Sequence, residues 1–130
     1  MRKRVIKNLP EVMEEIAAHY LWEIKPLLPL STFSQIKKSG NNFYFSCPFH
    51  EEKTPSCWYT PNNGAIYCFG CASYLENLIY FYMKVRQKNF FPAIIRLAKF
   101  FKIKIEWENK ILRSDEIQDE KYHRNMRSWY

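Results

Sequence analysis

The spacing of hydrophobic residues first follows a helical period. Apolar side chains recur at intervals of four within residues 8–24, which predicts an amphipathic helix there, and the stripe consists of Val12, Ile16 and Tyr20. Asn8 is a candidate N-cap for this helix. Pro26 interrupts the pattern, so we expect residues 25–34 to form a linker.

The pattern changes to short aromatic and β-branched runs from Asn42 onward. These runs read "FYFS", "CWYT" and "AIYCF", and the turn-like segments "EEKTP" and "PNNG" separate them. A further turn signal, "SGN", precedes the first run. Short strands joined by tight turns predict a small antiparallel sheet.

A helical period returns after Cys71. Apolar residues spaced i, i+3, i+4, i+7 predict two helices, and they are Leu75, Leu78, Ile79 and Tyr82, then Ile94, Leu97, Ala98 and Phe101. Lys84, Arg86 and Lys88 are expected at a solvated helix end. The predicted fold class is therefore α+β, with a small antiparallel sheet flanked by helices.

Composition and charge narrow the class of protein. A chain of 130 residues with 47% hydrophobic and 18% aromatic residues is expected to form a globular domain rather than a disordered chain. Net charge is +7, while residues 47–71 carry −1, so the basic residues flank the cysteine-rich segment. A basic excess favours a polyanion such as nucleic acid, or is simply a solvated surface.

Targeting signals are not evident in the sequence. The basic N-terminus is not followed by an apolar segment, which argues against a secretory signal. No apolar run approaches the roughly 18 residues of a membrane span. We expect a cytoplasmic protein with no membrane partner.

Two pairs of cysteine and histidine have the spacing of metal ligands. Cys47-x-x-His50 and Cys68-x-x-Cys71 are separated by 17 residues, which is the spacing of a zinc ribbon with one cysteine replaced by histidine. Three thiolates and one imidazole suit a single structural Zn²⁺ and leave no position for a catalytic water.

Other interpretations of these residues remain open at this point. The cysteines could form a disulfide, pack as ordinary buried residues or hold an iron–sulfur cluster. Cys57 has no partner at ligand spacing, so we expect a small core residue. His19 and His123 also lack ligand spacing and are expected to be structural or exposed.

Two segments of the sequence, "CPFHEEKTPS" and "YCFGC", point to one particular protein family. They resemble the zinc-binding domain of bacterial DnaG-type DNA primases, and the likeness extends over about residues 35–105. The family usually has glycine directly after the last cysteine, whereas this chain has "CASYLENLIYF". We therefore expect a different turn into the following helix. Cys57 occupies a position where the family usually has an aromatic residue.

The resemblance also implies what the chain lacks. Family members carry a Toprim-type catalytic domain with magnesium-binding acidic residues, and we find no such pattern before Tyr130. The expected organisation is an N-terminal helix and linker (1–34), a primase-like zinc-binding domain (35–106) and a charged C-terminal tail (107–130). Any enzymatic activity would be primer synthesis together with a partner protein.

In the family, the zinc domain helps to bind single-stranded template and to choose where a primer starts. Aromatic faces that stack on bases and cations that contact phosphates are suited to this role. Because strand residues alternate between faces, only about half of the aromatic residues can face outward. The candidate nucleic-acid-binding residues are Lys37, Lys38, Tyr44, Lys53, Trp58 and Tyr67.

Three hypotheses of function follow. The first is a freestanding DNA-binding accessory that serves a separate primase, polymerase or helicase during replication. The second is a zinc-ribbon scaffold that docks onto a replication or transcription protein. The third is the zinc half of a split primase.

Overall fold

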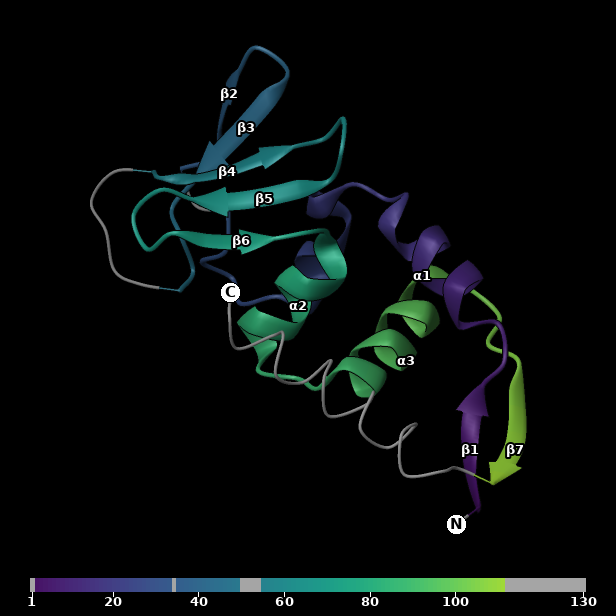
Figure 1. Ribbon diagram of the computed structural model, residues 1–130. Coiled ribbons are helices and arrows are strands. Elements are labelled where there is room, and N and C mark those ends of the chain that lie inside the picture. Colours follow the sequence, from purple (N-terminus) through teal and green to yellow (C-terminus); the bar gives the residue numbers. More distant parts are fainter. Residues whose placement is uncertain (1, 34, 50–54, 112–130) are drawn as a thin grey trace.

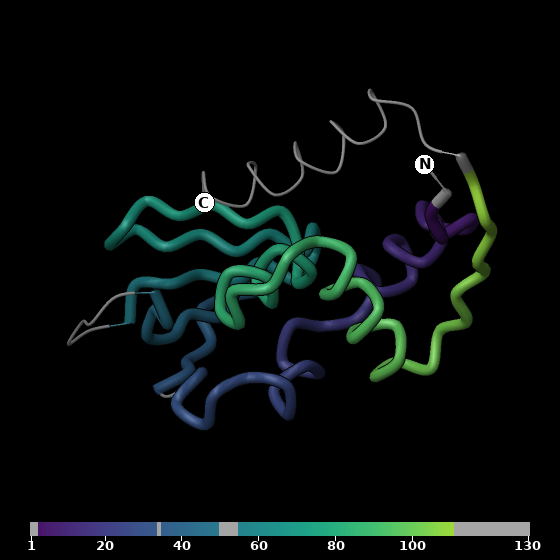
Figure 2. Tube along the Cα trace, turned by 90° about the horizontal axis from the view of Figure 1, so that it is seen from below, coloured from purple at the N-terminus to yellow at the C-terminus, as the bar shows by residue number. Residues whose placement is uncertain are grey.

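A computed structural model describes residues 2–33, 35–49 and 55–111 and confirms the α+β class (Figure 1). A five-stranded antiparallel sheet lies at one end of the molecule, and helices pack against it. A separate two-stranded sheet lies at the opposite end, with α1 and α3 between the two sheets (Figures 1 and 2).

The five-stranded sheet has the simple order β2-β3-β4-β5-β6, so each strand pairs with the next one in the sequence. The three predicted aromatic runs form its three central strands. Gly40 and Gly64 have positive φ angles of 61° and 78° in the β2–β3 and β4–β5 turns, a conformation that favours glycine. The strands are β2 (Lys37–Ser39), β3 (Asn42–Phe45), β4 (Cys57–Thr60), β5 (Ala65–Cys68) and β6 (Ser73–Leu75).

The inner face of this sheet contributes to the core. Its side chains are largely buried, as the alternation of strand residues requires, and they are Phe45, Cys57, Tyr59, Ile66, Cys68 and Leu75. Helix α2 (Leu78–Arg86) contacts β5 and β6, and all its residues from Leu78 to Met83 are buried. Asn77 caps this helix, since its side-chain oxygen accepts a hydrogen bond of 2.9 Å from the Ile79 N–H.

Helices α1 (Leu9–Ala17) and α3 (Phe90–Phe101) extend the core away from the sheet, and α1, α2 and α3 pack against one another. The predicted helix over residues 8–24 was too long. The α-helix ends at Ala17, and a separate 3₁₀ helix, η1 (Leu21–Leu27), replaces its last part and the start of the predicted linker.

Asn8 occupies the N-cap position of α1, as predicted, but its side chain does not cap the helix. Instead its amide donates to the Lys104 carbonyl at 3.0 Å, and its oxygen accepts from the Glu106 N–H at 2.8 Å. Asn8 therefore ties the start of α1 to the chain that leaves α3.

The two-stranded sheet joins both ends of the described chain. Strand β1 (Arg2–Ile6) pairs antiparallel with β7 (Trp107–Ile111), and Arg4 lies 4.3 Å from the ring centre of Trp107. Residues 107–111 thus form a strand, although their composition suggested only a charged tail. Among the described residues, no helix combines the length and the apolar character needed to cross a bilayer.

Candidate metal centre and sheet surface

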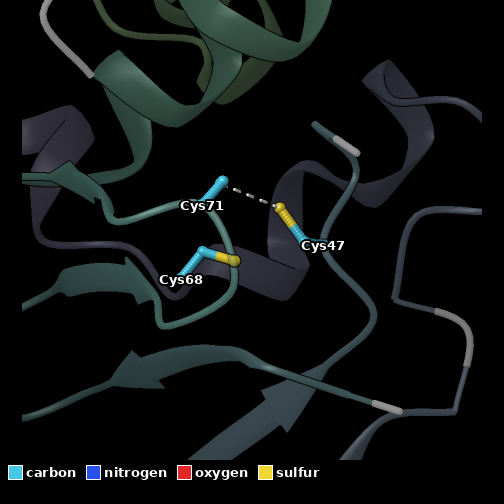
Figure 3. Close-up of side chains that lie close together, drawn as sticks. All are labelled: Cys47, Cys68 and Cys71. Atoms are coloured by element: carbon cyan, nitrogen blue, oxygen red, sulfur yellow. Dashed lines mark hydrogen bonds between the residues drawn. The ribbon is translucent and has the colours of Figure 1, made fainter. Parts of the chain in front are cut away.

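Three of the four predicted ligands come together beside the sheet. Cys47 follows the end of β3, Cys68 is the last residue of β5, and Cys71 lies in the turn between β5 and β6. Their sulfur atoms all lie within 4.8 Å of one another. Figure 3 shows the cluster, with a dashed line between Cys47 and Cys71 across 3.9 Å.

The separation of the Cys47 and Cys71 sulfur atoms fits a tetrahedral zinc site. Zn–S bonds of about 2.3 Å place two sulfur ligands of a tetrahedron about 3.8 Å apart. The observed separation of 3.9 Å between Cys47 and Cys71 agrees with this value. All four cysteines are free thiols, so the geometry gives no support to a disulfide.

The fourth predicted ligand, His50, lies outside the described residues, as does Lys53. The described chain reaches Phe49, two residues beyond Cys47, and resumes at Pro55. The role of His50 as a ligand therefore stays a prediction that rests on the spacing of the motif.

Cys57 is buried in the core, as predicted, and it also lies beside the metal centre. A hydrogen bond with the Cys57 thiol lowers the pKa of Cys47 to about 5. The backbone N–H of Phe49, whose nitrogen lies 3.4 Å from the Cys47 sulfur, also lowers this pKa. The same hydrogen bond, together with burial, raises the pKa of Cys57. The lowered pKa of Cys47 favours its thiolate form, which is the form that binds a metal.

Two serine hydroxyls also lie beside the cysteines. The Ser56 hydroxyl lies 3.4 Å from the sulfur of Cys68, and the Ser73 hydroxyl lies 3.1 Å from the sulfur of Cys71. Burial raises the pKa of Cys68 to about 11, which the Ser56 hydroxyl partly offsets. Sequence reasoning missed both serines, although each stands within a short motif beside the cysteines.

The turn after Cys71 places a non-glycine residue in a conformation that favours glycine. Ala72 has a φ of 56°, in the left-handed region where the family's usual glycine is unstrained. The chain then forms the short strand β6 before α2 begins. The alternating pattern of three residues was too short to predict this strand.

The outer face of the sheet carries a row of aromatic side chains. Tyr44, Trp58, Tyr67 and Tyr74 are successive cross-strand partners in β3 to β6, and Lys37 of β2 is the partner of Tyr44. Directly opposed residues share one face of a sheet, so these five side chains form one continuous row. The rings of Tyr44 and Trp58 stack with their centres 5.1 Å apart.

Four of the six predicted nucleic-acid-binding residues thus fall in this row, which we call the outer row (Lys37, Tyr44, Trp58, Tyr67 and Tyr74). Lys38 is exposed but pairs with Phe43, so it belongs to the other face. Tyr74 was missed because β6 was not predicted.

Phe69 extends the aromatic surface beyond the outer row. It is 67% exposed and contacts both Trp58 and Tyr67 edge-on. An open hollow lies on this face and is lined by Asn42, Trp58, Thr60, Ala65, Tyr67, Phe69 and Tyr74.

Comparisons with known proteins agree with this architecture. The family described as "CHC2 zinc finger", the zinc ribbon of DnaG, matches residues 12–113. The chain is 33% identical over 94 residues to the DNA primase of Buchnera aphidicola subsp. Acyrthosiphon pisum, covering 72% of this chain and 16% of that protein. It is 43% identical over 70 residues to the DNA primase of Pseudomonas aeruginosa, covering 54% of this chain and 10% of that protein.

A solved primase structure has a similar fold. The Aquifex aeolicus primase (zinc binding and RNA polymerase domains) superimposes with a TM-score of 0.60 at 26% identity, over 73% of this chain and 22% of that one. The chain thus spans only a small part of the relatives it matches. The family match covers most of the sequence, and the sulfur atoms of the three cysteines lie close enough together to hold a metal ion. This chain belongs to the CHC2 zinc finger family of DnaG-type primases, and its metal is zinc.

Proposed function

We propose that this chain binds single-stranded template on the outer row and serves a catalytic primase, carried by a separate protein, as an accessory in DNA replication. The observation that carries the proposal is the register of the sheet. It gathers four aromatic side chains and one lysine from five different strands into one row on a partly exposed face.

Aromatic rows of this kind suit single strands better than duplex. In a single strand the flat faces of the bases are accessible and stack on aromatic rings, which contributes about 1–3 kcal/mol per base. Tyr74 is 47% exposed and Phe69 is 67% exposed, so rings are available at the surface. Lys37 lies at one end of the outer row, where it would contact a phosphate.

Zinc has a structural role in this proposal. Cys47, His50, Cys68 and Cys71 would fill a tetrahedral shell, and no site for a reacting group would remain on the metal. Cys68 directly follows Tyr67 in β5, and Cys47 follows β3. Metal binding would therefore hold β3 and β5 in the register on which the outer row depends.

The catalytic part of primer synthesis would be supplied by the partner. Among the described residues, the one cluster of potential metal ligands is built from cysteines, which suit zinc rather than the Mg²⁺ of nucleotide transfer. Cysteines outside disulfides and a DNA template would both suit a cytoplasmic location.

The proposal can be tested by fluorescence anisotropy of the zinc-loaded protein with labelled single-stranded and duplex DNA over a salt series. We expect preferential binding to single strands, with an affinity that falls steeply as salt increases. Trp107→Ala is a matched control, because Trp107 is a partly exposed tryptophan on the other sheet. An absence of binding at low salt would contradict the proposal and would favour a protein-docking scaffold.

A further inference from the structure

A lysine of α2 is connected to the metal centre through Ser73. The Lys84 ammonium lies 3.0 Å from the Ser73 hydroxyl oxygen, which itself lies 3.1 Å from the sulfur of Cys71. Ser73 is buried, with 6% of its surface exposed. Lys84 was expected at a solvated helix end, but it is partly buried and lies 4.8 Å from the ring centre of Phe49.

The chemistry of these groups fixes the direction of the hydrogen bonds. A lysine ammonium can only donate, so the Ser73 oxygen must accept from Lys84. The single proton of Ser73 is then free to point at Cys71. A metal-bound thiolate carries no proton and can only accept, which matches this arrangement.

Cys71 is also the ligand that most needs such support. It is exposed, whereas Cys47 and Cys68 are buried. An exposed thiolate is the one that water and competing chelators reach first.

We infer that Ser73 and Lys84 act as a positioning pair that holds Cys71 on zinc and slows the release of the metal. This inference rests on the proposed role of Cys71 as a ligand. Outer hydrogen bonds to metal ligands commonly change metal affinity by about 10- to 100-fold.

The test measures the rate of zinc release into excess chromophoric chelator for the purified chain and its variants. Ser73→Ala removes the hydroxyl, and Lys84→Met removes the charge but keeps most of the apolar stem. Each is expected to release zinc about 10-fold faster than the parent while still binding one zinc. Lys99→Met, on the exposed side of α3, is the matched control and is expected to leave the rate unchanged.

The double variant separates a connected pair from two independent effects. Because Lys84 acts through Ser73, Lys84→Met should add little to the rate once Ser73→Ala is present. Unchanged release rates in both single variants would overturn the inference, and so would fully multiplicative effects in the double variant.

Failure of this inference is distinguishable from failure of the ligand assignment. Cys71→Ser is expected to lose zinc stoichiometry, not only release rate. If Cys71→Ser kept one firmly bound zinc, the ligand assignment itself would be wrong. If it lost zinc while Ser73→Ala and Lys84→Met behaved like the parent, only the positioning role would be wrong.

Discussion

The two faces of the five-stranded sheet are built from similar residues but have different surroundings. On the inner face, Phe45 and Tyr59 are buried against the helices, with 0% and 3% of their surfaces exposed. On the outer face, Tyr44 and Trp58 are only partly buried, mainly through contacts with other rings of that face. An aromatic side chain in this sheet therefore stabilises the fold or is available for a ligand according to its position in the alternation.

This difference separates two kinds of experiment. Changes on the inner face should reduce stability, whereas changes on the outer face should reduce nucleic-acid binding in a protein that remains folded. Zinc would be common to both, because its predicted ligands lie at or just beyond the ends of β3 and β5.

Removing a zinc ligand should have the largest effect, since it disrupts both faces at once. Cys68→Ser leaves an incomplete shell, and a structural zinc contributes on the order of 10 kcal/mol to folding. We expect the sheet to unfold and zinc binding to be lost, as measured by metal content and thermal denaturation. Retention of zinc and of the parent melting temperature would refute the ligand assignment.

Truncating an inner aromatic should have the second-largest effect. Phe45 is fully buried and contacts Phe33 and Phe81, so Phe45→Ala should lower the free energy of unfolding by about 3–5 kcal/mol. Urea denaturation of the zinc-loaded protein measures this change. The affinity of the remaining folded protein for DNA should stay close to that of the parent, and a large loss of affinity would argue against the separation of the two faces.

Truncating an outer aromatic should reduce DNA affinity more than it reduces stability. Trp58→Ala should weaken single-strand binding by about 1–3 kcal/mol, or about 5- to 150-fold, because one stacking surface is lost. Its effect on the free energy of unfolding should be smaller than that of Phe45→Ala. Anisotropy and urea denaturation of the same preparations test both parts, and an unchanged affinity would remove Trp58 from the binding surface.

Neighbouring lysines on opposite faces provide a finer comparison. Lys37→Ala removes one phosphate contact, so the slope of log affinity against log salt should become less steep by about 0.7. Lys38→Ala is the matched control, since Lys38 is equally charged and exposed but belongs to the other face. Equal effects of the two variants would indicate that any positive charge on the edge strand β2 contributes to binding, whether or not it lies in the outer row.

The smallest expected effect concerns the turn beside the metal centre. Ala72 has a positive φ, so Ala72→Gly should relieve backbone strain and stabilise the zinc-loaded protein by about 1 kcal/mol or less. A small rise in melting temperature with unchanged DNA affinity is expected. A clear loss of stability would show that the methyl group of Ala72 has a packing role.

The sequence by itself determined the features that depend on neighbouring residues. The Cys-x-x-His and Cys-x-x-Cys pairs specified zinc, the aromatic runs specified β3 to β5, and the apolar periods specified α2 and α3. Each of these signals lies within a short segment, because ligand spacing, strand alternation and helical period are local properties of the chain.

Only the tertiary structure decided which distant residues meet. The pairing of β1 with β7, the partly buried hydrogen bond of Lys84 to Ser73 and the interaction of Cys57 with Cys47 all join segments that local patterns cannot relate. The outer row also depends on the register of five strands, since a shift by one residue would turn Trp58 toward the core. Register and long-range contacts are set by packing of the whole domain. The sequence therefore indicated Tyr44, Trp58 and Tyr67 as candidates, but it could not predict that they lie side by side.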